Sequence, residues 1–192
     1  MSRFDIIATP IEGVKLIQRK PIVDERGSFS RFYCAEEFID AGINKPIAQI
    51  NHTLTNQKGA VRGLHFQYAP DTEIKVVSCL KGKIFDVAVD IRQNSPTFLQ
   101  WHGEVLSAEN RKSLVVPEGF AHGFQALTDN CEIIYCVTTA YSVKNESIIN
   151  AIDPVVAINW PQPITERSAR DIAQPNITAT FTGLPLAPFS NT

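Results

Sequence analysis

The stretch Ile84-Phe85-Asp86-Val87-Ala88-Val89-Asp90-Ile91-Arg92 decides the fold class. Its odd-numbered positions from Phe85 to Ile91 are apolar, whereas the even-numbered positions from Asp86 to Arg92 carry two Asp, an Ala and an Arg. A period of two is typical of a β-strand with one apolar face. The stretch therefore predicts a strand in the middle of the chain.

Further runs of this kind lie along the chain, separated by turn signals rich in Gly, Asn, Asp and Pro. They cover residues 14–18, 28–34, 47–54, 61–67, 73–80, 113–116, 120–127 and 131–141. One short helix is expected at 35–41, with Phe38 and Ile39 facing the core and Gly42 closing its end. Many short strands at near-even spacing predict an all-β chain, either an antiparallel barrel or a double-sheet jelly roll.

Length and composition favour one domain over residues 1–192, with 44 % hydrophobic and 20 % charged residues. The net charge of -2 argues against a nucleic-acid partner. No apolar run reaches the ~20 residues of a membrane helix, and residues 1–10 do not resemble a signal peptide. The scattered Cys34, Cys79, Cys131 and Cys136 predict reduced core thiols in a cytoplasmic protein. Prolines after residue 150 predict an irregular tail, 150–192, that wraps the barrel.

A bound metal is not expected. Barrels of this class often hold iron, manganese or zinc through an HxH pair, a Glu and a distant His. The histidines here are His52, His65, His102 and His122, and they form no such pair. No GxGxxG motif indicates a redox cofactor either, so we expect no cofactor at all.

Several residues could carry chemistry, and each has a structural alternative. His65 follows Arg62 and Gly63, and by itself such a strand histidine is more often a satisfied core or surface residue. Lys75 lies between apolar neighbours and could be an edge-strand lysine or a cation that holds an anion inside the barrel. His122 lies between two glycines, which indicates either close approach of a ligand or a bulged strand.

Tyr135 and Tyr141 are both odd-numbered positions of the predicted strand 131–141, so they would lie on the same face. The ordinary interpretation of such tyrosines is that their rings pack in the core. A straight strand would hold them roughly 20 Å apart. Asp171 falls in the irregular tail, where an Asp is usually a turn or cap residue. Strict alternation also puts Arg62 and His65 on opposite faces, so both reach one pocket only if Gly63 kinks or bulges the strand.

Taken in order, the motifs form a specific set. They are Asp24-Glu25-Arg26-Gly27-Ser28-Phe29, Gln49-Ile50-Asn51, Arg62-Gly63-Leu64-His65-Phe66-Gln67, Lys75, the stretch from Phe85 to Arg92, Ser95-Pro96-Thr97-Phe98, Leu106-Ser107, Pro117-Glu118-Gly119-Phe120-Ala121-His122-Gly123-Phe124, Tyr135, Tyr141, Asp153-Pro154, Trp160-Pro161 and residues 168–171. With this set the chain resembles the dTDP-4-dehydrorhamnose 3,5-epimerase family, nucleotide-sugar epimerases of the cupin class. The resemblance covers about residues 5–175.

The resemblance implies a metal-independent, cupin-like jelly roll (double-stranded β-helix) that forms a homodimer. Residues 1–34 would carry strands that the two subunits exchange. It assigns the catalytic base to His65 with Asp171 as its orienting carboxylate, enolate stabilisation to Lys75, and proton donation to Tyr135. The positions that match the sugar and diphosphate pocket are Arg62, Gln49, Asn51, His122 and Tyr141. Arg26 and Phe29 match positions that reach the nucleotide from the neighbouring subunit.

The chemistry suits these residue types. A 4-keto group makes the C3 and C5 hydrogens acidic, and a His held by an Asp is a base near neutral pH. A fixed Lys ammonium stabilises the charge that forms on the ketone oxygen. Inversion needs a proton from the opposite face, which a phenol such as Tyr135 can deliver.

The chain departs from the family pattern at Arg31, where a Glu usually stands two residues beyond the Phe of Arg-Gly-x-Phe. Such a Glu can accept from the N–H of thymine, whereas Arg only donates. Either Arg31 turns outward, or it shifts the preferred base from thymine toward cytosine.

The function expected from the resemblance is conversion of dTDP-4-dehydro-6-deoxy-D-glucose to dTDP-4-dehydro-L-rhamnose, for polysaccharide biosynthesis such as that of O-antigen. The alternatives within the class are epimerisation at C3 or C5 alone, or action on a CDP-linked 4-keto sugar. A non-enzymatic sugar-nucleotide binding barrel is the alternative from another class, and a cupin dioxygenase is disfavoured because its metal ligands are missing.

Overall fold

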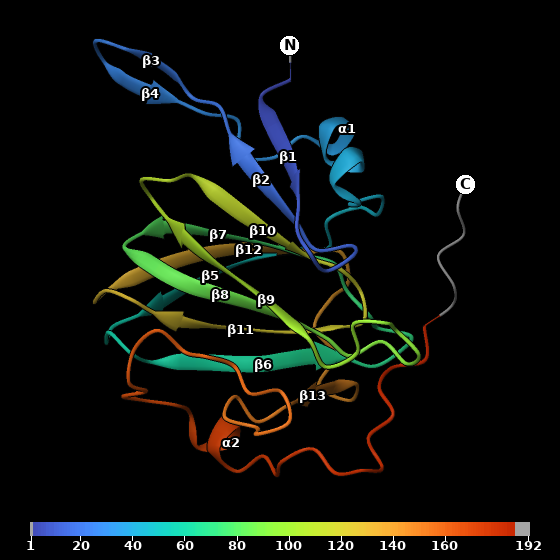
Figure 1. The fold of residues 1–192 in the computed structure, drawn as a ribbon. Coiled ribbons are helices and arrows are strands. Elements are labelled where there is room, and N and C mark those ends of the chain that lie inside the picture. Colours follow the sequence, from blue (N-terminus) through green and yellow to red (C-terminus); the bar gives the residue numbers. More distant parts are fainter. Residues whose placement is uncertain (1, 187–192) are drawn as a thin grey trace.

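The computed structural model describes residues 2–186, and two antiparallel β-sheets packed face to face form its body (Figure 1). The first sheet has the order β1 (Phe4–Ala8), β2 (Lys15–Arg19), β10 (Lys112–Val116), β7 (Lys75–Lys81), β12 (Cys131–Val137), β5 (Gln49–Thr55). The second has the order β13 (Glu146–Ile148), β6 (Val61–Gln67), β11 (Phe120–Ala126), β8 (Lys83–Asp90), β9 (Trp101–Ser107). This is the cupin-like jelly roll that the strand pattern and the resemblance predicted.

Three smaller elements complete the described chain. A two-stranded hairpin of β3 (Ile22–Asp24) and β4 (Gly27–Phe29) projects from the body at the upper left of Figure 1. The helical turns are α1 (Ala35–Phe38), η1 (Ile39–Ala41) and, in the tail, α2 (Ala169–Ile172).

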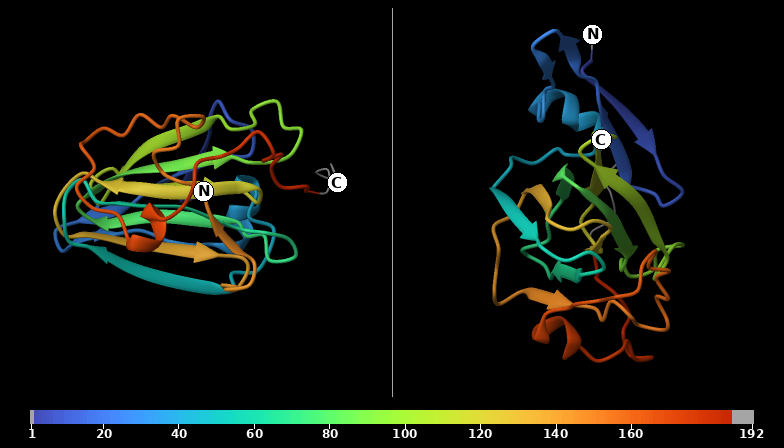
Figure 2. Two further views of the ribbon diagram at one scale, coloured as in Figure 1. Left: turned by 90° about the horizontal axis from the view of Figure 1, so that it is seen from below. Right: turned by 90° about the vertical axis from the view of Figure 1, so that its left-hand side faces the viewer.

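The alternation in β8 is as the sequence predicted. Ala88 lies in the core between the two sheets, whereas Val87 and Val89 pack on the outer face of the second sheet. Val156 and Leu184 of the tail cover that outer face, and the red and orange chain runs along it in both views of Figure 2. Side chains of the irregular tail segments therefore cover the outer face of the second sheet. The last residues of the tail, 187–192, lie outside the described residues.

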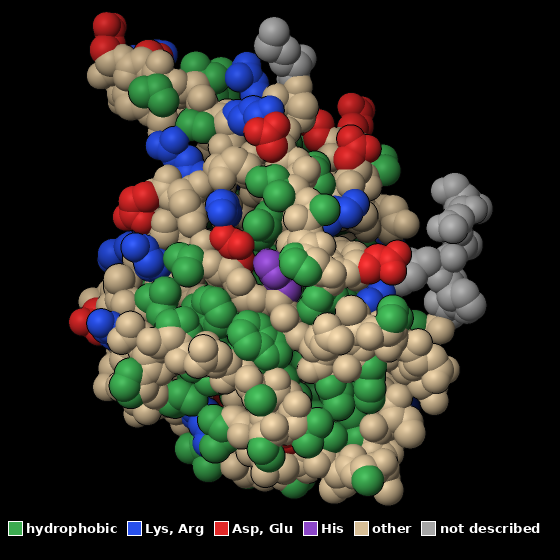
Figure 3. All heavy atoms as spheres, in the orientation of Figure 1, with side chains coloured by type: hydrophobic (Ala, Val, Ile, Leu, Met, Phe, Trp, Pro, Cys, Tyr) green, Lys and Arg blue, Asp and Glu red, His purple; other side chains and the backbone are tan. Residues whose placement is uncertain are grey.

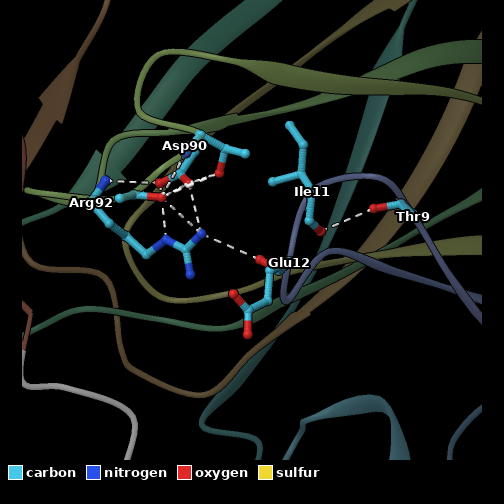
Figure 4. Close-up of polar contacts among 7 residues, drawn as sticks. Thr9, Ile11, Glu12, Asp90 and Arg92 are labelled. Carbon is cyan, nitrogen blue, oxygen red and sulfur yellow. Dashed lines mark hydrogen bonds and ion pairs between the residues drawn. The ribbon is translucent and has the colours of Figure 1, made fainter.

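A buried ion pair between Asp90 and Arg92 connects the loop after β8 to the β1–β2 turn. The carboxylate of Asp90 accepts hydrogen bonds from the backbone N–H and the guanidinium of Arg92, and from the hydroxyls of Ser95 and Thr97. The Arg92 guanidinium also donates to the carbonyl of Glu12 in the β1–β2 turn (Figure 4). Because a buried charge needs both an opposite charge and hydrogen bonds, this cluster holds the loop after β8 in place.

Some boundaries differ from the predictions. The strand expected at 28–34 ends at Phe29, because β4 pairs only with the short β3. The strand expected at 131–141 ends at Val137, where its pairing with β5 and β7 also ends. In the helical segment Phe38 is buried and Gly42 adopts a left-handed conformation as expected, but Ile39 is 60 % exposed.

The strands β1, β3, β9 and β13 carry no clear alternation and were not predicted. All four cysteines are free thiols; Cys79, Cys131 and Cys136 are buried and Cys34 is half-buried. Within residues 2–186, no helix has the length and apolar character that a membrane crossing requires.

Candidate active site

A cavity of about 740 Å³ opens between the two sheets and is bounded on one side by the tail. Strands of both sheets supply its walls, because side chains of alternate residues point inward from each strand. Among the residues predicted from the sequence, those that line it are Gln49, Asn51, Arg62, His65, Lys75, His122, Tyr135, Tyr141 and Asp171.

The edge strand β5 presents its polar side chains to this cavity. Gln49, Asn51 and Thr53 line the cavity, whereas the alternate residue Ile50 is 63 % exposed on the opposite face. In an ordinary antiparallel sheet the apolar side chains point to the interior and the polar ones to solvent, so β5 shows the reverse arrangement. The arrangement favours a polar ligand inside the barrel and a covering surface outside it.

A bulge at Gly63 brings Arg62 and His65 to one cavity. On β11, His122 faces His65 and Phe124 faces Arg62, so two residues of β6 oppose one of β11. The bulge reverses the parity of the strand, as required for both side chains to point inward. Gly63 has φ +134°, and a Cβ there would lie 2.5 Å from the Cα of Gly123. Only glycine fits this backbone without a shift.

His65 lies between two carboxylates. Its Nδ1 is 2.9 Å from Oε1 of Glu146, and its Nε2 is 3.4 Å from Oδ1 of Asp171. The first distance is that of a hydrogen bond, whereas the second is longer than a normal one. Asp171 thus stands beside the imidazole as expected, but Glu146 makes the closer contact.

Glu146 is a member of the site that sequence reasoning missed. Besides His65, its carboxylate accepts hydrogen bonds from the phenol of Tyr141 at 2.6 Å and from the guanidinium of Arg170 at 2.5 Å. Burial raises the pKa of the Glu146 carboxyl, but these donors outweigh burial and hold the pKa below its ordinary value. No local pattern marks Glu146, because it begins the three-residue strand β13.

Asp171 is placed by the short helix α2. The hydroxyl of Ser168 accepts a hydrogen bond from the backbone N–H of Asp171, which is the usual N-cap contact. Burial raises the pKa of the Asp171 carboxyl, but the neighbouring His65 imidazole more than compensates, so the pKa lies below its ordinary value. The carboxylate therefore remains ionised beside the imidazole.

Lys75 and Tyr135 project into the cavity from adjacent strands. The Lys75 ammonium lies 3.0 Å from the carboxylate of Glu73, a second group absent from the sequence prediction. Burial, and then the Glu73 charge, raise the pKa of the Tyr135 phenol. Tyr135 is therefore a neutral phenol that can donate a proton.

Tyr141 is not on the strand of Tyr135. Because β12 ends at Val137, the chain turns back and the Tyr141 hydroxyl reaches Glu146. The separation of roughly 20 Å along a straight strand thus does not apply, and both phenols line one cavity.

His122 belongs to a second histidine–carboxylate pair. Its Nε2 lies 2.8 Å from Oδ1 of Asp86, and both side chains are buried on the inner face of the second sheet. This contact fixes the orientation of the His122 ring at the wall of the cavity.

Three predicted residues lie outside the cavity of their own chain. Arg26 pairs with Asp24 in the projecting hairpin at 2.6 Å, and Phe29 beside it is 69 % exposed. Arg31 forms a 2.6 Å salt bridge with Glu37 of α1. In the described part of the chain, no group of three or more His, Cys, Asp and Glu side chains is arranged to hold a metal ion.

The jelly roll and this cavity define a cupin-like protein with an acid–base site. Residues 8–179 match the family model described as dTDP-4-dehydrorhamnose 3,5-epimerase. The enzyme of that name from Salmonella typhimurium is 43 % identical over 172 residues, which cover 88 % of this chain and 93 % of the relative. The chain belongs to the dTDP-4-dehydrorhamnose 3,5-epimerase family, and it is an isomerase, as the resemblance predicted.

Solved structures agree. That of the 3,5-epimerase from Legionella pneumophila, in complex with dTDP-4-keto-L-rhamnose, has a TM-score of 0.88 and 40 % identity, covering 96 % of this chain and 100 % of that one. A 3'-monoepimerase from Streptomyces bikiniensis, in complex with dTDP-quinovose, has a TM-score of 0.80 and 30 % identity, covering 88 % and 86 %. Both are enzymes, which argues against a non-enzymatic binding barrel.

Proposed function

We propose that this protein inverts C3 and C5 of dTDP-4-dehydro-6-deoxy-D-glucose, giving dTDP-4-dehydro-L-rhamnose. The observation that carries the proposal is the cavity in which a histidine between two carboxylates, a lysine and a half-buried phenol face one space. The greater identity to the 3,5-epimerases than to the 3'-monoepimerase favours inversion at both carbons over inversion at one.

His65 acts as the base in this proposal. Because Glu146 lies at hydrogen-bonding distance from Nδ1, its carboxylate accepts a hydrogen bond from Nδ1–H, which leaves the lone pair on Nε2. Asp171 is too far for a normal hydrogen bond, but its charge stabilises the imidazolium that forms when Nε2 takes a proton from carbon. Such acid–base help contributes on the order of 10²–10⁴-fold.

Lys75 and Tyr135 complete the reaction. The enolate oxygen that forms from the 4-keto group carries negative charge, and the Lys75 ammonium stabilises it more than it stabilises the ketone. Tyr135, on β12, stands on the other sheet from His65, on β6. A substrate ring held between them would lose a proton to one side and gain a proton from the other, which is inversion.

The diphosphate needs cations, and the cavity supplies them. Arg62, Arg167 and Arg170 line it, together with the polar side chains of Gln49 and Asn51. Guanidinium groups bind phosphate oxygens in a bidentate manner, which orients the sugar toward His65.

The nucleotide end is completed by a second subunit in this proposal. The hairpin β3–β4 exposes Ile22, Val23 and Phe29, and it projects away from the body in Figure 3. Exposed apolar side chains on a projecting hairpin favour contact with a partner chain. We therefore propose a homodimer in which the segment 1–34 lies against the partner, with Arg26 and Phe29 at its nucleotide site.

Deletion of residues 1–34 tests the dimer. It would leave the edge of β10 unpaired, because β2 is its partner, so an aggregated or inactive product is expected. An active, soluble monomer in sedimentation and turnover assays would contradict the exchange of strands.

The orientation of Arg31 bears on whether the nucleotide base is thymine or cytosine. Its salt bridge with Glu37 favours the outward orientation, and we keep thymine as the base on that ground. We also propose that the protein acts in the cytoplasm, which the free thiols support. We propose a role in the biosynthesis of a rhamnose-containing polysaccharide, which the names of the relatives support.

NMR of the reaction in D₂O tests the proposed function. The protein is incubated with dTDP- and CDP-4-keto-6-deoxyglucose, and deuterium is followed at C3 and C5. We expect turnover of the dTDP sugar with deuterium at both carbons. Exchange at one carbon only, or faster turnover of the CDP sugar, would favour the corresponding alternative.

A further inference from the structure

The carboxylate of Asp86 uses only one of its oxygens in the contact described above. Oδ1 lies 2.8 Å from His122 Nε2, whereas Oδ2 is buried and has no hydrogen-bond partner among residues 2–186. A buried carboxylate oxygen without a partner is costly, so such an atom usually has a ligand or a water molecule beside it.

A second buried polar atom without a partner lies on the neighbouring strand. In the register of β8 and β9, Glu104 faces Asp86 and His102 faces Ala88, so all of these side chains share the inner face. His102 Nε2 is buried and likewise has no hydrogen-bond partner within the described chain. Glu104 Oε2 is 3.9 Å from it, beyond hydrogen-bonding distance.

The register of β8 and β9 allows a bridge between the two atoms. Asp86 and His102 are diagonal neighbours on one face, with backbone positions about 7–8 Å apart, and a water bridge spans about 5–6 Å between its two partners. We propose that an internal water molecule joins Asp86 Oδ2 to His102 Nε2. His102 is then a positioning residue that acts on His122 through Asp86.

The surroundings suit this arrangement. The titratable groups around His102 and Asp86 include His122 from β11, Glu104 from β9 and the neutral Cys79 thiol from β7. Glu104 in turn engages Lys112 of β10 at 2.8 Å. Burial lowers the pKa of His102 although Glu104 opposes this, so the imidazole is neutral near pH 7 and its Nε2 can accept a hydrogen bond. A water molecule has two protons, one for Asp86 and one for His102.

The bridge would hold Asp86 with Oδ1 toward His122. This inference rests on the proposed function only because His122 lines the cavity of the reaction. Removal of the bridge would free Asp86 to rotate and would release the His122 ring, which changes turnover more than substrate binding.

A pair of variants tests this role. His102→Leu removes the acceptor, whereas His102→Gln puts an amide near the Nε2 position and keeps a polar partner for the water. We expect His102→Leu to lower kcat about fivefold with KM within about twofold, and His102→Gln to keep more than half of the kcat. His52→Gln is the control, because His52 lies on the outer face of β5 and its side chain is 55 % exposed.

Two measurements are independent of turnover. Imidazole ¹⁵N NMR should show the Nε2–H tautomer of His122 in the wild type and a shifted His122 signal in His102→Leu but not in His52→Gln. A high-resolution crystal structure should contain a water within about 3.2 Å of both Asp86 Oδ2 and His102 Nε2. No such water, unchanged His122 signals in His102→Leu, or an equal loss of kcat in both His102 variants would overturn the proposal. If the wild type turns over no nucleotide sugar, the proposed function fails, but these two measurements still decide the bridge.

Discussion

Gly63→Ala tests the bulge that brings Arg62 and His65 into one cavity. The added Cβ would lie 2.5 Å from the Cα of Gly123 and 2.9 Å from the carbonyl oxygen of His122. Both contacts are with backbone, which cannot rotate away as a side chain can. The backbone of Gly63 also has φ +134°, where a residue with a Cβ is strained.

The magnitude follows from these two costs. Backbone strain at a positive φ costs about 1–3 kcal/mol, and overpacking of a well-packed interior costs about 1–3 kcal/mol. Together they predict a loss of about 2–6 kcal/mol of unfolding free energy. For a chain of this size this loss corresponds to a decrease in Tm of roughly 5–20 °C.

Thermal unfolding and turnover of the same variant provide the assay. Gly27→Ala is the matched control for stability, because its φ is +128° but no atom lies within 4 Å of the added Cβ. We expect Gly63→Ala to lose more stability than Gly27→Ala, and to lose kcat by more than tenfold as His65 moves relative to Arg62. Equal Tm decreases in the two variants with near-wild-type turnover in Gly63→Ala would refute the reasoning.

Further predictions concern charge. Lys75→Met should abolish exchange at C3 and C5 whereas EDTA has no effect; loss of wild-type activity on chelation that a divalent ion restores would contradict a metal-independent reaction. The pKa values of Glu146 and Asp171 lie below their ordinary 4.5 and 3.8, so the stability that these carboxylates contribute is complete above about pH 5 and is lost as the pH falls through the lowered values. An acid titration of Tm should show this loss, and Glu146→Gln should reduce it. Because Arg31 forms a salt bridge with Glu37, we expect Arg31→Glu to leave the affinities for dTDP and CDP unchanged in calorimetry. A change from a preference for CDP to one for dTDP would instead show that Arg31 contacts the base.

The parts of the fold that repeat a period of two could be predicted from the sequence. β8 has a clear apolar face and was predicted at nearly its full length. The run 28–34 was also predicted as a strand, but β4 stops at Phe29 because a strand needs a partner, and pairing is not visible in local sequence. β9 does pair with β8 but was not predicted. Its inner face carries the polar residues His102 and Glu104, so its sequence shows no apolar alternation.

The candidate site shows the same limit. His65 and Lys75 could each be structural residues when judged alone, and only the ordered set of motifs indicated the family and their roles. Glu146 and Glu73 were missed, because a carboxylate at the edge of a short strand or loop has no local signature and becomes part of the site only through contacts with distant residues. The bulge at Gly63 could be anticipated, because strict alternation contradicted the roles that the resemblance implies for Arg62 and His65.

The central claim is that His65 removes the substrate protons, with its imidazole oriented by Glu146 and its charge balanced by Asp171. The most direct test is the rate of hydrogen–deuterium exchange at C3 and C5 of dTDP-4-keto-6-deoxyglucose in D₂O, followed by NMR for the wild type and for His65→Ala. The account predicts exchange at both carbons in the wild type, and a loss of at least about 10²-fold at both carbons in His65→Ala while dTDP affinity stays within about twofold. Exchange in His65→Ala at the wild-type rate would contradict it.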